Sequence, residues 1–203
     1  MCGRFWRDIG WDEYRRGLTV MAPAVPQNYE PHFDVRPTTQ ALVARPVEGG
    51  VELVDMRWGL VPFWHRKPLK DFKLTSFNAR SETVATAATF REAFKRRRCL
   101  VPARGWYEWT GPKGGKTKWS FRHRSDPFIM FAGLWDRAET PDGPVESFTI
   151  LTRAPRSCLA DWHDREPIVV ARGGWDAWLE NDTDCAPLIA AVEHDEFAVE
   201  QAE

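Results

Sequence analysis

Gly105-Trp-Tyr-Glu-Trp109 is one of five short runs of strand-forming residues that decide the fold. β-Branched and aromatic residues are enriched in such runs, and Gly, Pro or charged residues separate them, as is typical of successive strands. The other four runs are Cys99-Leu-Val-Pro102, Trp119-Ser-Phe-Arg122, Phe128-Ile-Met-Phe-Ala132 and Ser147-Phe-Thr-Ile-Leu-Thr152. Lys113-Gly-Gly-Lys116 is predicted to be a hairpin tip. The pattern predicts an α+β fold built on mainly antiparallel β-strands.

Two further strands are predicted upstream of these runs, at residues 40–45 and 51–60. Gly49-Gly50 lies between them, and a glycine pair in that position is typical of a hairpin turn. Residues 21–37 contain four prolines and are predicted to cross the surface as an extended segment. A short strand is also predicted at Pro167-Ile-Val-Val170.

A few short helices are predicted to flank the strands. Asp8 is the expected N-cap of a helix that reaches residue 18. Thr89 is the expected N-cap of a second helix, because Glu92 follows three residues later, and Phe90 and Phe94 then share its apolar face. The remaining predictions are a helical turn over 155–162 and a helix around Trp175-Asp-Ala-Trp-Leu179.

Composition indicates one soluble globular domain over residues 1–203. The chain is 43% hydrophobic and 28% charged, with no linker-like stretch and no run long enough for a membrane helix. Four separated cysteines and the absence of metal-ligand spacing favour neither a disulfide framework nor a metal site, and no cofactor is expected. Cys99 and Cys158 are interpreted as packing residues. Because no secretion signal precedes Cys2, we expect the protein to be in the cytoplasm, associated with the nucleoid. We also expect it to be a monomer.

Charge is distributed unevenly along the chain. Residues 1–125 contain 23 Lys and Arg against 12 Asp and Glu, whereas residues 126–203 contain 5 against 17. The halves therefore carry about +11 and −12, although the total is −1. If folding gathers the basic residues on one face, that face attracts phosphate. A surface of mixed, solvated charge is the alternative.

Cys2 directly follows Met1, so removal of Met1 leaves a free 1,2-aminothiol at the start of the chain. An α-amine has a pKa of about 7.7–8.0, against about 10.4 for Lys, and is therefore partly neutral and nucleophilic at pH 7. It can form an imine with an aldehyde. The thiol of the same residue can then add to the imine carbon and close a five-membered thiazolidine. Taken alone, a cysteine at position 2 is also explained by chance.

Several motifs, in order, resemble the SOS-response-associated peptidase (SRAP) family of abasic-site shield proteins. The resemblance begins with Met1-Cys-Gly-Arg-Phe5 and covers roughly residues 1–170. It implies an SRAP-like, barrel-like sheet and a covalent crosslink to abasic sites in single-stranded DNA. The remaining motifs are Trp58-Gly-Leu-Val-Pro62, Phe77-Asn-Ala-Arg-Ser-Glu-Thr83, Arg98-Cys-Leu-Val-Pro-Ala103, Gly105-Trp-Tyr-Glu-Trp109, Ala132-Gly-Leu-Trp135, Thr149-Ile-Leu-Thr152 and His163-Asp-Arg-Glu-Pro167.

The resemblance implies catalytic roles for Cys2, Asn78, Glu108 and His163. Asn78 would hold the amine or a sugar oxygen by hydrogen bonds. Glu108 would relay protons, because its aromatic neighbours are expected to raise its pKa by desolvation. His163 would protonate the ring oxygen of deoxyribose and so release the reactive aldehyde. Structural roles for the last three, in a turn, on a strand surface and in packing, are the alternatives.

DNA-binding roles are predicted for residues beside these candidates. Arginine side chains hold phosphates, and flat side chains stack on bases in single-strand binders. Solvated arginines and core tryptophans are the alternatives, and the Arg96-Arg97-Arg98 run is interpreted as structural. The candidates are Arg4, Arg80 and Arg165 for phosphates, and Trp64, His65 and Trp109 for bases.

Parts of the chain differ from the family pattern. Glu166 stands where Met is common and is expected to weaken phosphate binding beside Arg165. The C-terminal region of about 30 residues diverges, with the family's Val-Asn-Asn segment absent from 190–196. The leading hypothesis is thiazolidine capture of abasic sites through Cys2, with attendant strand cleavage by β-elimination. The alternatives are an N-terminal-nucleophile cysteine peptidase with His163 as base, including autoproteolysis, and a non-covalent single-stranded DNA-binding module.

Overall fold

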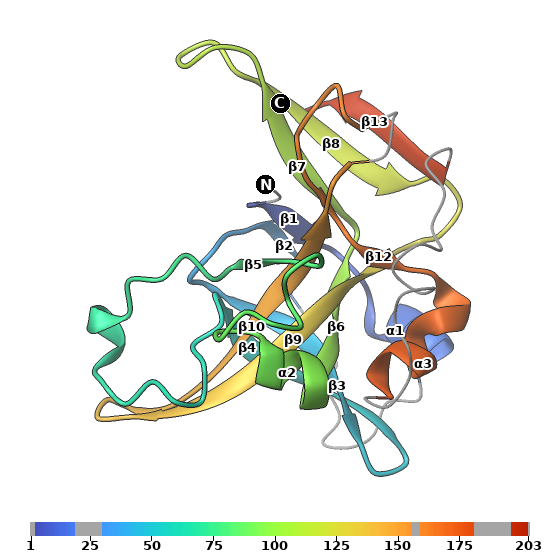
Figure 1. The fold of residues 1–203 in the computed structure, drawn as a ribbon. Helices are drawn as coiled ribbons and strands as arrows, with labels where there is room; N and C mark the ends of the chain where they lie inside the picture. The colour runs from blue at the N-terminus through green and yellow to red at the C-terminus, as the bar shows by residue number, and fades with distance from the viewer. Residues whose placement is uncertain (1–2, 19–29, 156–158, 181–195, 203) are drawn as a thin grey trace.

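A closed barrel of five strands forms the centre of the molecule (Figure 1). The computed structural model describes residues 3–18, 30–155, 159–180 and 196–202. Around the barrel the order is β10-β4-β3-β6-β9, and β9 pairs with β10 to close it. The pairing of β4 with β10 is parallel and the other four are antiparallel. The strands are β3 (Gln40–Val47), β4 (Gly50–Trp58), β6 (Arg98–Ala103), β9 (Ile129–Thr140) and β10 (Gly143–Arg153).

A second sheet of five antiparallel strands lies against the barrel (Figure 1). One hydrophobic cluster joins the two, since Phe5 and Trp106 of the sheet pack with Trp58 and Phe131 of the barrel. The ring centroids of Phe5 and Trp58 are 5.1 Å apart. The strand order is β13 (Phe197–Gln201), β8 (Thr117–His123), β7 (Gly105–Thr110), β1 (Phe5–Arg7) and β2 (His32–Val35).

Three short strands extend the barrel sheet. β5 (Asn78–Arg80) runs parallel to β10, and β11 (Glu166–Pro167) pairs antiparallel with β10. β12 (Val169–Val170) pairs with β9. Thr152 of β10 is in register with both Arg80 and Pro167, so the 78–82 and 163–167 segments meet at the end of this strand.

Short helices cover the barrel. A second hydrophobic cluster lies beneath them, where Phe128 packs between Tyr14 and Trp175, and Phe90 and Phe94 pack at its edge as predicted. Both faces of β6 are consequently buried, which explains why its sequence is a continuous apolar run. The helices are α1 (Trp11–Gly17), α2 (Arg91–Arg96) and α3 (Trp175–Leu179), with 3₁₀ turns η1 (Leu69–Asp71) and η2 (Arg172–Gly174).

Both predicted helix caps are wrong. Gly10 occupies the N-cap position of α1, and its backbone N–H donates to the Glu13 carboxylate at 2.7 Å. Asp8 instead forms an ion pair with Arg104 at 2.8 Å, a partner that the local pattern does not reveal. Phe90, not Thr89, occupies the N-cap position of α2.

The predicted fold class is confirmed. The hairpin between β3 and β4 turns at Gly49, which has a φ of 82°, and Gly111 and Gly114 adopt positive φ in the β7–β8 hairpin. The predicted strand at 167–170 divides between β11 and β12. Within the described residues, no helix is long and apolar enough to cross a membrane.

Candidate functional site

The first described residues at the N-terminus run beside β7. The carbonyl of Arg4 accepts a hydrogen bond from the backbone N–H of Tyr107 at 2.9 Å. The Arg4 guanidinium lies 5.1 Å from the centre of the Trp109 ring, and its Nε is 3.5 Å from Oδ1 of Asp34. Two predicted DNA-binding residues, Arg4 and Trp109, are therefore in contact. Cys2, Cys158 and the 190–195 segment lie outside the described residues.

Glu108 is a buried carboxyl group, with 4% of its surface exposed. Strand alternation places it on the same face of β7 as Trp106, and Trp119 lies opposite it on β8. Burial, with a smaller contribution from the nearby carboxylate of Asp164, raises the pKa of Glu108 to about 7. Glu108 is thus partly protonated near neutral pH, as a proton-relaying group requires.

His163 lies at the start of the segment that leads into β11. Its Nδ1 accepts a hydrogen bond from the backbone N–H of Arg165 at 3.0 Å. Oδ1 of Asp164 lies 2.6 Å from the same Nδ1. Partial burial lowers the pKa of His163, so the neutral form predominates near pH 7.

Glu108 and His163 belong to the same region of the molecule. Trp162 precedes His163 and packs edge-to-face on Trp119, with ring centroids 6.0 Å apart. Trp119 is the cross-strand neighbour of Glu108. Asp164 acts electrostatically on both titrating groups.

Asn78 and Arg80 come from β5. Asn78 is half-buried in register with Ile150, whereas the side chain of Arg80 is exposed. The strand is held beside Trp58, whose indole N–H donates to the Phe77 carbonyl at 2.7 Å. Asn78 and Arg80 thereby reach the end of β10, where the His163 segment also arrives.

Arg165 connects these two segments. Its guanidinium donates two hydrogen bonds to the Glu82 carboxylate, at 2.7 and 2.8 Å, and a third to the Thr152 carbonyl at 2.7 Å. The paired charge lowers the pKa of Glu82 to about 2. Glu166 is 4% exposed and forms an ion pair with Arg153 at 2.5 Å, so a cation inside the protein compensates its charge.

The remaining aromatic candidates lie on the long segment between β4 and β5, which projects from the barrel beyond β5 (Figure 1). Trp64 is 45% exposed, and its indole N–H donates to the Ala88 carbonyl at 3.4 Å. His65 is only 8% exposed and packs edge-to-face on Phe72. The structure thus presents Trp64 to solvent and encloses His65.

Sequence reasoning assigned no role to Glu82 or Asp136. Glu82 holds Arg165, and it lies within the Phe77–Thr83 motif that was already recognised. Asp136 directly follows the Ala132–Trp135 motif, and it accepts a hydrogen bond from the backbone N–H of Phe63. The sequence signal that could have indicated a role for these residues is their position, within a recognised motif for Glu82 and directly after one for Asp136.

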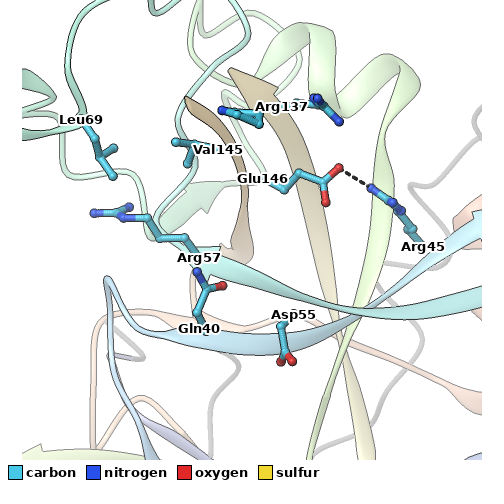
Figure 2. Close-up of a pocket in the computed structure, with 9 residues that line it drawn as sticks. Gln40, Arg45, Asp55, Arg57, Leu69, Arg137, Val145 and Glu146 are labelled. Atoms are coloured by element: carbon cyan, nitrogen blue, oxygen red, sulfur yellow. Dashed lines mark hydrogen bonds and ion pairs between the residues drawn. The ribbon is translucent and has the colours of Figure 1, made fainter. Parts of the chain in front are cut away.

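A separate hollow of about 570 Å³ lies on the barrel wall and contains none of the predicted site residues (Figure 2). Arg45 and Glu146 form an ion pair across it at 2.9 Å, and Arg57 donates to the Gly59 carbonyl at 2.7 Å. The described part of the chain contains no group of three or more His, Cys, Asp and Glu side chains arranged to hold a metal ion.

The fold and the candidate site together define a class of protein: a small β-barrel with an attached sheet, with the titratable side chains of Glu108 and His163 in one region between them. The SOS response associated peptidase (SRAP) model matches residues 1–202, and the chain belongs to this family. The chain is 31% identical over 182 residues to the abasic site processing protein YoqW of Bacillus subtilis, covering 88% of this chain and 80% of that protein. The abasic site processing protein YedK of Escherichia coli is 30% identical over 190 residues, covering 90% and 81%. A crystal structure of a protein from Bordetella bronchiseptica superimposes with a TM-score of 0.83 at 25% identity and full coverage of both chains.

Proposed function

We propose that this protein processes abasic sites in single-stranded DNA by capturing their aldehyde covalently on Cys2 after removal of Met1. Membership of a family whose relatives are named abasic site processing proteins supports the DNA lesion as substrate. The observation that carries the proposed chemistry is the buried carboxyl of Glu108, whose pKa of about 7 suits proton transfer near neutrality.

Chain connectivity supports the participation of Cys2. Only Gly3 lies between Cys2 and Arg4 in the sequence, so their Cα atoms are at most about 7 Å apart. The carbonyl of Arg4 is hydrogen-bonded to Tyr107, the neighbour of Glu108 in β7. This link between Arg4 and the strand that carries Glu108 supports the proposal that the aminothiol and this acid act on one bound aldehyde.

The proposed reaction has two covalent steps. The neutral α-amine of Cys2 adds to the aldehyde carbon and gives a carbinolamine. Glu108 protonates its hydroxyl, which leaves as water to give an iminium ion, and the iminium N–H proton returns to the Glu108 carboxylate, so an imine remains. The Cys2 sulfur then adds to the imine carbon while the nitrogen takes up the thiol proton, closing a thiazolidine. The net change joins DNA to protein and releases one water molecule, with no oxidation or reduction.

Opening of the sugar ring precedes capture, because a closed deoxyribose has no free aldehyde. His163, in the fraction that is protonated, is the proposed proton donor to the ring oxygen; the bond from this oxygen to the anomeric carbon breaks, and the anomeric hydroxyl gives its proton to water and becomes the aldehyde. The Asn78 amide would orient the sugar oxygen by hydrogen bonding. Strand cleavage by β-elimination from the imine stage belongs to the same proposal, since the imine acidifies the adjacent carbon.

Binding of the DNA is assigned to cationic and aromatic side chains around this chemistry. Arg4, Arg80 and Arg165 would contact phosphates, and Trp64 and Trp109 would contact bases. His65 carries less of this role because its ring is enclosed. We expect a monomer that acts in the cytoplasm at the nucleoid.

Intact-mass spectrometry with an abasic single-stranded oligonucleotide tests the proposal. The expected product has the mass of the protein without Met1 plus the oligonucleotide, less one water. Cys2→Ala should form no thiazolidine, whereas Cys99→Ala, which removes a fully buried thiol, should still form the product. A retained Met1, or an identical adduct in Cys2→Ala, would refute the mechanism.

The family description favours one second candidate, a peptidase that uses the Cys2 thiolate with His163 as base. Incubation with a peptide library in the absence of DNA distinguishes the two functions. Turnover that requires Cys2 would support the peptidase. Salt-sensitive DNA binding without any covalent product would instead support a non-covalent binding module.

A further inference from the structure

Phe63 lies next to Trp64 on the segment between β4 and β5, and 41% of its surface is exposed. Its backbone is fixed on both sides. The Phe63 N–H donates to the Asp136 carboxylate at 2.9 Å, and the Phe63 carbonyl accepts from the Arg66 guanidinium at 2.7 Å. Trp64, the next residue, is 45% exposed, so two consecutive aromatic side chains are presented to solvent on this segment.

Arg97 covers one side of this aromatic side chain. Its guanidinium carbon lies 5.8 Å from the centre of the Phe63 ring, within the range of a cation–π contact. The Arg97 Nε is 3.2 Å from Oδ1 of Asp136. Asp136 is 2% exposed, so one buried carboxylate fixes both the Phe63 backbone and the cation above the ring.

The charges that follow Phe63 indicate the chemistry of the ligand. Residues 66–73 contain four exposed cations and one exposed acid, Asp71. Exposed aromatic rings beside a cationic stretch are typical of single-stranded nucleic-acid binding, in which bases stack and the backbone follows positive charge. An apolar surface of a protein partner would not compensate the positive charge of these side chains. The four cations are Arg66, Lys67, Lys70 and Lys73.

We propose that Phe63 and Arg97 form a base-stacking platform beside Trp64, with Asp136 as the residue that positions them. The ligand is an unpaired nucleobase of single-stranded DNA, whose neighbouring phosphate lies near Arg97. This inference deepens the proposed function and rests on it for the identity of the nucleic acid. It adds Phe63 and Arg97 to the DNA-binding surface and gives the buried Asp136 the role of positioning them.

Fluorescence anisotropy with a labelled single-stranded oligothymidylate that carries no lesion tests the platform independently of Cys2. Phe63→Ala should weaken affinity by about 5- to 100-fold, the usual loss for one stacked base. Phe63→Tyr keeps the ring face and should restore the wild-type affinity. Leu74→Ala is the matched control, because it truncates a 54% exposed apolar side chain of the same segment without removing an aromatic face.

A double-mutant cycle tests the role of Asp136. Asp136→Asn should weaken binding in the wild-type background but have little further effect in Phe63→Ala, because both changes remove the same contact. Equal losses in both backgrounds would contradict a positioning role and indicate general destabilisation. Thermal unfolding by circular dichroism identifies variants that are not folded at the assay temperature.

Two outcomes would overturn the platform itself. Wild-type affinity of Phe63→Ala would assign the exposed ring to a protein partner, and an equal loss of affinity in Leu74→Ala would show that the aromatic face is not what binds. Failure of the proposed function is a separate result. If no Cys2-dependent adduct forms but Phe63→Ala still weakens binding, the platform stands and the covalent chemistry does not.

Discussion

Replacing Glu108 by Gln is expected to change the pH dependence of stability as well as the chemistry. The ordinary carboxyl pKa of 4.5 rises to about 7 in the folded protein because the group is buried. At 1.36 kcal/mol per pKa unit, this difference corresponds to about 3 kcal/mol. Gln cannot ionise and has nearly the same shape, so the substitution isolates this electrostatic cost.

The sign follows from proton binding. Between pH 4.5 and about 7 the folded protein holds a proton on Glu108 that the unfolded chain has released, so stability falls as pH rises. Below pH 4.5 the group is neutral in both states. Glu108→Gln should therefore gain up to about 3 kcal/mol over the wild type at pH 8, relative to their difference at pH 4.

Urea unfolding monitored by tryptophan fluorescence, repeated at intervals from pH 4 to pH 8.5, measures this difference. Subtracting the wild-type from the variant free energy removes contributions from groups that both proteins share. A difference that stays constant across the range would refute the reasoning, because it would mean that Glu108 titrates alike in the folded and unfolded states. Activity assays on the same samples should show the opposite effect, with the more stable variant less active.

Three other predictions follow from the site and its supports. The rate of adduct formation, measured by gel-shift time courses, should decline above about pH 7 as Glu108 ionises. Glu108→Gln should lower this rate by roughly 10²- to 10⁴-fold and remove the decline. An unchanged pH profile in the variant would count against Glu108 as the acid. Arg153→Met should lower the free energy of unfolding by about 3 kcal/mol, because it leaves Glu166 buried without this cation; equal urea midpoints would contradict this. Gly105→Ala should lose more than about 2 kcal/mol, because the new Cβ would lie 2.1 Å from the Phe121 carbonyl oxygen, and an unchanged melting temperature would show that β8 can move aside.

Local sequence was sufficient to predict the strands but not their closure into a barrel. Aromatic and β-branched runs mark β6 to β10, and glycines mark two hairpins, because these signals depend on neighbouring residues. The parallel pairing of β10 with β4 and β5 joins distant segments, and no local pattern encodes it. The cap prediction at Asp8 failed for the same reason, since Arg104 lies 96 residues away.

In the candidate site, too, local sequence predicted individual residues but not the contacts between distant segments. Asn78, Glu108 and His163 were identified from motifs, and aromatic neighbours predicted the raised pKa of Glu108. The contacts of Glu82 with Arg165 and of Asp136 with Phe63 span 83 and 73 residues, respectively. Such long-range contacts require the folded structure.

The candidate site is built from segments that are far apart in the sequence and meet at the end of β10. It can therefore form only after the last of these segments has been synthesised. A chain elongated at about 5–20 residues per second contains its N-terminus roughly 8–30 s before residue 163 is added. β7 and Glu108 are added about two-thirds of the way through that interval, and His163 only at its end. A newly made chain would therefore carry residue 2 long before Glu108 and His163, so the proposed capture of a lesion would require a chain whose synthesis is nearly complete.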